Sequence, residues 1–350
     1  MTGIRRVSDL GTRGAVNIVD GSIQTADIAS NVITQAKIDT NIPLSGMRNM
    51  LINGSFDIWQ RWVATSIDVG SGVTAYTADR WFLSPVGATM GAIRTTNIRA
   101  NSNSIYVYEI TPNGVGGSTC RLGQRIEAAN VSRLRGTVTF SAWIYNNTGA
   151  AITPNLLLGT PSASDNFTSV TNRLTQALQS CPNATWTQVS HTVDISGYTN
   201  IANGLQVELE TSNHTTYGKI VRVSEVQLER GSQITPFEHR PPALESLMCK
   251  RYFWRCVDPA AVGVNDANIR STRTLIPFHT EMRAAPTSVV SGTLNFWNGS
   301  STGTGTGLIG TFNTRNHGQL DFNGGVGAHT GVVTLYTTGG SQYIDFLAEL

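Results

Sequence analysis

The sequence has few charged residues and no long apolar run, and each shortage excludes a class of protein. Only 14% of the 350 residues are charged, the formal net charge is +2, and no run of Lys or Arg is present, so we expect no nucleic-acid partner. No apolar stretch approaches the ~20 residues that cross a bilayer, so we expect no membrane insertion. The first residues lack the apolar segment of a secretory signal, which predicts a soluble protein made in a cytoplasm.

Cysteine is also scarce. The four residues Cys120, Cys181, Cys249 and Cys256 are too few and too scattered for a disulfide scaffold in a chain of this length. Their spacing does not match the close cysteine pairs of a zinc site. We therefore expect free, mostly buried thiols.

The residues that are abundant favour strands and turns. Gly occurs 35 times and Ser, Thr and Asn are frequent, which predicts a mainly β fold. In residues 205–210 the apolar Leu205, Val207 and Leu209 alternate with polar residues, so one face of that strand is expected to be buried. Similar signals recur at residues 105–110, 137–145, 186–195 and 220–228. They predict a central antiparallel β-sandwich of the jelly-roll type over residues 48–241.

The remainder of the chain after this module has two parts. Residues 242–256 begin with Pro242 and place apolar residues on one helical face, which predicts a short connector helix. Residues 257–350 return to strand signals and predict a smaller C-terminal β-sandwich. Within it, the Gly- and Thr-rich residues 298–307 are expected to form an exposed loop.

Residues 1–47 contain a short internal repeat that carries too little apolar mass to fold alone. Ile23 and Ile28 recur ten residues later as Ile33 and Ile38. Short repeats of this kind become stable by stacking on copies of themselves or on another protein, so we expect an attachment and oligomerisation segment. A disordered polar leader is the alternative.

Several motifs in a fixed order resemble the family of bacteriophage tail-fibre and related virion appendage proteins. They are residues 49–61 (NMLINGSFDIWQR), 78–81 (ADRW), 227–232 (QLERGS), 235–241 (TPFEHRP), 249–253 (CKRYF), 282–287 (MRAAPT) and 348–350 (AEL). The N-terminal repeat is similar to the lead-in segments of phage fibres. The match covers the chain from about residue 49 to its end.

This resemblance implies a structural protein of the virion, synthesised in the host cytoplasm. We expect a tail fibre that binds other virion proteins through its N-terminal segment, contacts a host surface glycan through its β modules and assembles as a homo-oligomer. The trimer is taken from the resemblance to fibres. A head decoration, collar or baseplate protein with no receptor-binding role is the alternative, since both roles suit a rigid sandwich.

The central module also resembles carbohydrate-binding jelly rolls, whose first strand begins with a similar Asn-Gly-Ser-Phe-acid pattern. In that family a structural calcium is often held by an acid of the first strand and an acid of the last. The matching positions here are Asp57 and Glu225. Glu225 is followed by Val226 where the family often has paired acids, so ordinary surface acids are the alternative, and we expect no other cofactor.

Tryptophans are the residues best suited to stacking on sugars. Trp59, Trp62, Trp81, Trp143 and Trp186 lie inside strand patterns or motifs, so we expect them to pack in the core. Trp297 stands beside the Gly- and Thr-rich stretch and is the candidate for an exposed binding aromatic. Its expected polar partners are Asn295, Asn298 and Tyr343.

A polysaccharide-cleaving fibre is a further alternative. Hydrolysis of a glycosidic bond usually needs two carboxylates at a fixed separation, and nothing in the spacing of the acids pairs them. The sequence also lacks a Gly-x-Ser-x-Gly elbow, a metal-binding His pair and a phosphate loop. We therefore expect a protein that binds and is not an enzyme.

Overall fold

The computed structural model describes most of the chain after its N-terminal segment. The described residues are 47–61, 66–114, 119–132, 134, 136–214, 216–266, 271–311, 313–325, 331–337 and 342–350. They belong to one compact unit, Ser45–Leu350. The expectations for Ile23, Ile28, Ile33 and Ile38 lie outside the described residues. Among the helices that are described, none has the length and apolar character to cross a bilayer.

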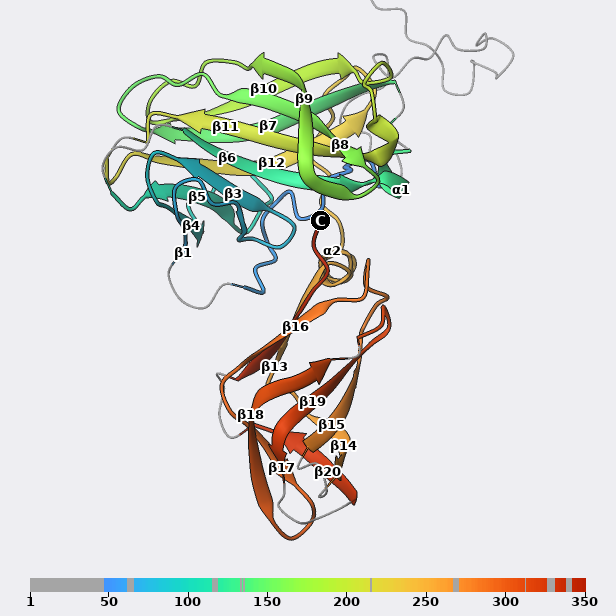
Figure 1. Ribbon diagram of the computed structural model, residues 1–350. Helices are drawn as coiled ribbons and strands as arrows, with labels where there is room; N and C mark the ends of the chain where they lie inside the picture. Colours follow the sequence, from blue (N-terminus) through green and yellow to red (C-terminus); the bar gives the residue numbers. More distant parts are fainter. Residues whose placement is uncertain are drawn as a thin grey trace, which may run out of the picture. The chain divides into compact units, whose positions relative to one another are not determined.

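Two six-stranded antiparallel sheets form the first module (Figure 1). Sheet A contains, in spatial order, β1 (Ile67–Val69), β4 (Met90–Thr95), β5 (Val107–Pro112), β12 (Ile220–Arg230), β7 (Thr137–Asn147) and β10 (Thr185–Asp194). Sheet B contains β2 (Ala75–Tyr76), β3 (Phe82–Val86), β6 (Thr119–Glu127), β11 (Gly204–Ser212), β8 (Asn155–Ala163) and β9 (Asn166–Ala177). The chain crosses repeatedly between the sheets, so the predicted mainly β fold with a jelly-roll sandwich is confirmed.

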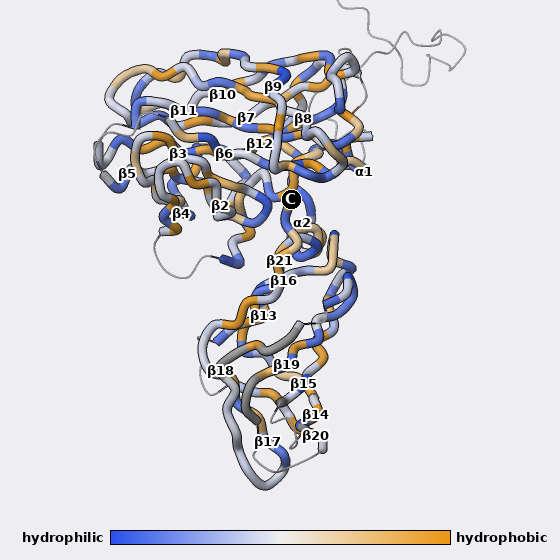
Figure 2. The backbone as a smooth tube through the Cα atoms, viewed as in Figure 1, coloured by the Kyte–Doolittle hydropathy of each residue, from blue (hydrophilic) through white to orange (hydrophobic). Residues whose placement is uncertain are grey.

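Apolar and polar residues alternate along strands of the sandwich (Figure 2), and the apolar side chains build the core between the two sheets. Leu205, Val207 and Leu209 of β11 are buried, as the period-two pattern predicts. An aromatic group is part of this core: the Phe56 ring centroid lies 5.1 Å from that of Trp81 and 5.2 Å from that of Tyr108. Phe56 belongs to the sequence motif at residues 49–61, which we call the first motif. This motif thus helps to stabilise the sandwich.

The described residues include three short helical segments: α1 (Ala128–Val131), the 3-10 turn η4 (Ile201–Asn203) and α2 (Pro242–Lys250). Helix α2 begins at a proline, which suits a first helical turn, and carries Glu245 in that turn and Lys250 in its last turn, as the helix dipole favours. The sequence pattern predicts that this connector helix continues to residue 256. The structure ends the helix at Lys250, and Phe253 already begins a strand.

The C-terminal module consists of β strands, but its arrangement differs from the second sandwich that the sequence predicts. A three-stranded sheet is formed by β13 (Phe253–Val257), β21 (Tyr343–Leu347) and β16 (Thr287–Ser291). A closed barrel follows the order β14 (Ala261–Asp266), β15 (Ser271–Pro277), β19 (His317–Gly325), β18 (Thr302–Thr311), β17 (Leu294–Trp297) and β20 (Gly331–Tyr336).

Pairing of β14 with β20 closes the barrel, and closure removes free strand edges. Gly263 is required at this point because a side chain there would meet the backbone oxygen of Arg273 at 2.3 Å. Such closure depends on long-range pairing, which strand patterns alone do not reveal. The barrel and the three-stranded sheet share one core, in which Trp254 stacks on Phe346 with centroids 5.5 Å apart.

The Gly- and Thr-rich stretch is a strand over much of its length, which corrects the expected loop at residues 298–307. Strand β18 begins at Thr302 and pairs with both β17 and β19. Its register shifts between Gly305 and Gly307, which is typical of glycine at irregular strand positions. Partner strands supply the order that the segment's own composition does not.

The last residues of the chain are held by cations of the sandwich. Glu349 forms ion pairs with Arg61, at 3.2 Å, and with Arg80. Tyr76 donates a hydrogen bond to the carbonyl oxygen of Leu350 at 2.9 Å. The Arg80 side chain is only 1% exposed and lies over the ring of Tyr252, 3.4 Å from its centroid. The carboxylate of Glu349 therefore neutralises an arginine that is otherwise enclosed by protein.

All four cysteines are free, as predicted; Cys120, Cys181 and Cys249 are buried and Cys256 is partly exposed. Burial raises the pKa of Cys181 and of Cys256 to about 11. These thiols stay protonated at neutral pH, as expected for structural cysteines.

A buried histidine gives the sandwich a defined response to acid. Desolvation lowers the pKa of His214 from 6.5 to about 4, while the backbone carbonyl of Lys219 raises it less. The unfolded chain takes up the proton first, so stability is full above pH 6.5 and falls as the pH drops to about 4. We expect a loss of about 3 kcal/mol in the unfolding free energy of the native protein relative to His214→Gln over this range. Urea unfolding of both proteins at several pH values measures it, and parallel curves would refute it.

Candidate functional site

The outer face of sheet A carries a row of aromatic side chains. On β7, Ala142 and Ile144 point into the core, so Trp143 and Tyr145 project from the opposite face. Tyr145 is paired in register with Trp186 of β10, and their ring centroids lie 5.5 Å apart. All three rings are partly exposed. They form what we call the aromatic row: Trp143, Tyr145 and Trp186.

Two ion pairs flank the aromatic row on the same face. Arg222 of β12 is in register with both Tyr145 and Glu109, and its Nε lies 2.7 Å from a carboxylate oxygen of Glu109. The Arg222 guanidinium lies 5.1 Å from the Tyr145 ring centroid. Arg99 lies 4.1 Å from the Trp143 ring centroid and pairs with Glu225 at 3.2 Å. Each cation is thus neutralised and also fixes a ring by a cation–π contact.

A hollow of about 290 Å³ opens beside Trp143. Polar groups that line it include Arg99, Asn101, Asn103, Gln188 and Glu225, and Phe237 and His239 form one wall. Gln188 is in register with Trp143, so its amide lies next to the ring along the sheet. Rings beside amide and hydroxyl groups are the composition of a site that binds an uncharged, polar ligand.

A bulge in β12 aims Glu225 into this hollow. The register of β12 against β7 shifts between Ser224 and Gln227, and Glu225 has a positive φ of 52°. The bulge is held from the first motif, because Val226 donates a backbone hydrogen bond to Gly54 at 2.9 Å. A side chain at Gly54 would meet the Val226 oxygen at 2.2 Å, so glycine is required there.

The two acids that the resemblance assigns to calcium are engaged differently. Glu225 accepts a hydrogen bond from Ser102 on one oxygen and is paired with Arg99 on the other. Asp57 accepts a hydrogen bond from Ser55 at 2.7 Å. In the part of the chain that the structure describes, no group of three or more His, Cys, Asp or Glu side chains is placed to hold a metal. A guanidinium beside Glu225 does not fit a calcium ion there.

Of the residues predicted to bind a ligand around Trp297, the structure places Tyr343 in a different sheet from Asn295 and Trp297. Trp297 is 48% exposed at the end of β17, as expected, and Asn295 lies on the same strand. The Asn298 side chain accepts backbone hydrogen bonds from Ser300, at 3.0 Å, and Ser301, at 2.8 Å, and so stabilises its own turn. Tyr343 lies in the three-stranded sheet under Arg255. A ligand at Trp297 remains a prediction.

The sequence pattern did not predict that the aromatic row lies on the outer face of sheet A. Trp59 and Trp81 are buried, as predicted, while Trp62 lies outside the described residues. Trp143 and Trp186 are corrections, since neither belongs to the core cluster. Along β7, both the odd-numbered and the even-numbered positions include bulky residues. The sequence therefore does not show by residue size alone which of the two sets faces the core. The signal that favours the observed phase is the run of small polar residues, Thr137, Thr139 and Ser141, that precedes Trp143 at the same spacing.

Comparisons with known proteins return carbohydrate-binding modules among solved structures. The chain is 15% identical to the CBM22-2 xylan-binding domain of Xyn10C from Paenibacillus barcinonensis, with 43% of this chain and 92% of that chain covered and a TM-score of 0.31. For TmCBM61 in complex with β-1,4-galactotriose the identity is 13%, the coverage 53% and 100% and the TM-score 0.30. For the C-terminal family 22 module of Clostridium thermocellum Xyn10B the values are 11%, 48% and 97%, and 0.33.

The fold of this chain is defined by its strand pairing and its core. A further match, to the MgGH51 arabinofuranosidase, spans only 26% of that enzyme. No protein-family model matches the chain, and no curated protein does.

Proposed function

We propose that this protein is a non-catalytic glycan-binding protein whose binding surface is the outer face of sheet A. The observation that carries the proposal is the aromatic row beside the polar hollow. Indole and phenol rings cover the apolar faces of sugar rings, while amides bond to sugar hydroxyls. Trp143 with Gln188 offers that combination on a rigid strand pair.

The charges on this face support binding of a hydroxyl-rich glycan. Arg222 is paired with Glu109 and Arg99 with Glu225, so the face presents no unpaired charge among these four groups. A sugar chain lying over them needs no charge of its own. Planar side chains held by ion pairs are also preorganised for hydrogen bonding to hydroxyls, which lowers the ordering cost of binding.

The same pairing argues for binding without hydrolysis. Glycosidases use one carboxylic acid that protonates the leaving oxygen and one carboxylate that acts as base or nucleophile. Glu109 and Glu225 each accept a charged hydrogen bond from an arginine, so both carboxylates are already engaged by neighbouring side chains. Neither is placed as a proton donor.

We further propose that the glycan belongs to a host surface and that the protein is a phage appendage, most simply a homotrimeric tail fibre anchored by residues 1–47. This setting is supported by the order of the sequence motifs. A head decoration, collar or baseplate protein is the second candidate. Several weak glycan sites on one oligomer would give high avidity without a tight single site.

A glycan array probed with the full chain tests the binding function. We expect retention on hydroxyl-rich glycans and no release of new reducing ends when the bound glycan is incubated with the protein. If no glycan on the array bound the protein, the proposed binding function would be wrong. If new reducing ends appeared, the protein would be a catalyst and not only a binding protein. An adsorption assay distinguishes the two candidate positions in the virion. A purified tail fibre is expected to block phage adsorption to host cells, and a head, collar or baseplate protein is not.

A further inference from the structure

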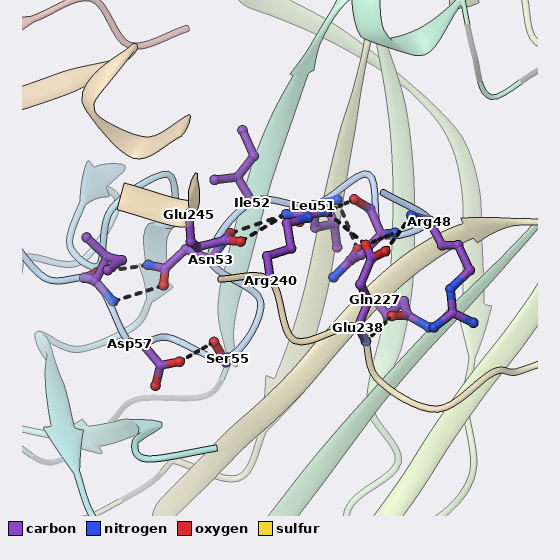
Figure 3. Close-up of polar contacts among 12 residues, drawn as sticks. Arg48, Leu51, Ile52, Asn53, Ser55, Asp57, Gln227, Glu238, Arg240 and Glu245 are labelled. Carbon is purple, nitrogen blue, oxygen red and sulfur yellow. Dashed lines mark hydrogen bonds and ion pairs between the residues drawn. The ribbon is translucent and has the colours of Figure 1, made fainter. Parts of the chain in front are cut away.

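A second pocket lies directly beyond the wall of the sheet A hollow. It has a volume of about 220 Å³ and is lined by the turn of the first motif, including Ser55 and Asp57, and by residues 237–240. Figure 3 shows Ser55, Asp57, Glu238 and Arg240 from this lining. Phe237 and His239 line both the hollow and this pocket, with their rings edge to face and centroids 4.8 Å apart. A sugar chain on sheet A can therefore continue over this pair into the second pocket.

Carboxylates outnumber cations around this second pocket. Its lining contains Asp57, Glu238 and Glu245 but only one guanidinium, that of Arg240. Arg240 is shared between Glu245, at 3.2 Å, and Glu238, at 3.4 Å. Three carboxylates against one guanidinium leave the pocket with two negative charges in excess, which favours a cationic ligand.

Asp57 is the acid of this pocket with spare hydrogen-bonding capacity. Glu238 accepts backbone hydrogen bonds from Arg48, at 3.0 Å, and Asn49, at 2.9 Å. Asp57 accepts one hydrogen bond, from Ser55 on Oδ2, while its Oδ1 is buried without a partner (Figure 3). Asp57 lines the pocket, is partly exposed and has a single neutral donor, so a ligand that supplies a charged donor is favoured there.

The rest of the pocket wall suits a sugar ring. Ile58, Ile105, Tyr106 and Phe237 supply apolar surface opposite the acids. One ring face can pack on this surface while an amine points at Asp57. The lining thus combines the two requirements of an amino sugar, an apolar platform and an anionic partner for its ammonium group.

We propose that this pocket binds an amino-sugar residue with a free, unacetylated amine, and that Asp57 recognises its ammonium group. This inference rests on the proposed function, since it names one sugar of the glycan that lies on sheet A. Glucose lacks the charge, and N-acetylation removes it. Both sugars are expected to bind more weakly.

Titration of the full chain with glucosamine, glucose and N-acetylglucosamine, followed by NMR, tests the pocket. The wild type is expected to bind glucosamine about tenfold more tightly than the other two sugars, and Asp57→Asn to lose this preference. Asp68→Asn is the matched control, because Ser66 donates to Asp68 at 2.9 Å as Ser55 does to Asp57, but Asp68 is exposed and outside the pocket.

Two further variants allow the result to be interpreted if Asp57→Asn folds poorly or if the sheet A surface does not bind glycan. Ile105 is 62% exposed, so Ile105→Lys leaves the fold intact and brings a competing ammonium to the pocket; it is expected to weaken glucosamine binding even if Asp57→Asn folds poorly. Trp143→Ala is expected to keep the glucosamine preference, so failure of the sheet A surface and failure of the pocket are distinguished. Equal affinity for glucosamine and glucose overturns the proposal. So does a preference that survives Asp57→Asn, or a stabilisation by calcium chloride that Asp57→Asn abolishes.

Discussion

Replacing Trp143 by alanine is expected to weaken glycan binding at least tenfold while the protein keeps its thermal stability. The side chain projects from sheet A away from the core, so its removal opens no cavity. It is also the member of the aromatic row that lines the polar hollow. Loss of a central aromatic contact typically costs on the order of 2 kcal/mol of binding free energy, which is more than tenfold in affinity. Calorimetry with the glycan that gives the strongest array signal measures the change.

Trp81→Ala is the matched contrast. Trp81 is 1% exposed and packs on Phe56 in the sandwich core, so its truncation is expected to lower the unfolding free energy by about 3–5 kcal/mol. The two variants should therefore differ in the property that is lost. Trp143→Ala should lose glycan binding, and Trp81→Ala should lose stability. If Trp143→Ala unfolded as readily as Trp81→Ala and still bound glycan, the assignment of the outer face would be wrong.

Replacing Glu349 by alanine is expected to destabilise the protein by about 3–5 kcal/mol, the usual cost of leaving one partner of a buried ion pair unpaired. Glu349 is the carboxylate for both Arg61 and Arg80, and the Arg80 side chain is 1% exposed. Without the acid, that guanidinium would remain enclosed with its charge unneutralised. Urea unfolding with a single transition would give the difference directly.

Glu281→Ala is the control for this change. Glu281 pairs with Arg315 at 3.0 Å, but both side chains are about half exposed, at 53% and 47%. Exposed pairs usually contribute less than about 1 kcal/mol, so this variant should unfold almost as the wild type does. Similar losses for the two glutamates would show that burial of the Glu349 cluster has no special role.

Much of the fold could be predicted because it depends on local patterns. The alternation of Leu205, Val207 and Leu209 placed β11 correctly, and the prolines at 241 and 242 placed the start of α2. The free thiols followed from cysteine spacing. These features are set by neighbours in the sequence, so residue order alone carries the information.

Other features depend on contacts between distant segments. Closure of the barrel needs β14 to pair with β20, about seventy residues later, and β18 is ordered by its partner strands. The ion pair of Arg99 with Glu225 joins positions 126 apart in sequence, so its neutralisation could not be foreseen. Trp143 was assigned to the core because a large apolar residue in a strand usually lies there.

Indole N–H signals of the tryptophans, followed by NMR while a bound glycan is added, test the central claim most directly. If the outer face of sheet A is the binding surface, the signals of Trp143 and Trp186 will shift with the glycan concentration while those of Trp59 and Trp81 stay in place. Unmoved Trp143 and Trp186 signals, together with a shifting Trp297 signal, would contradict the account and place the ligand on the C-terminal barrel.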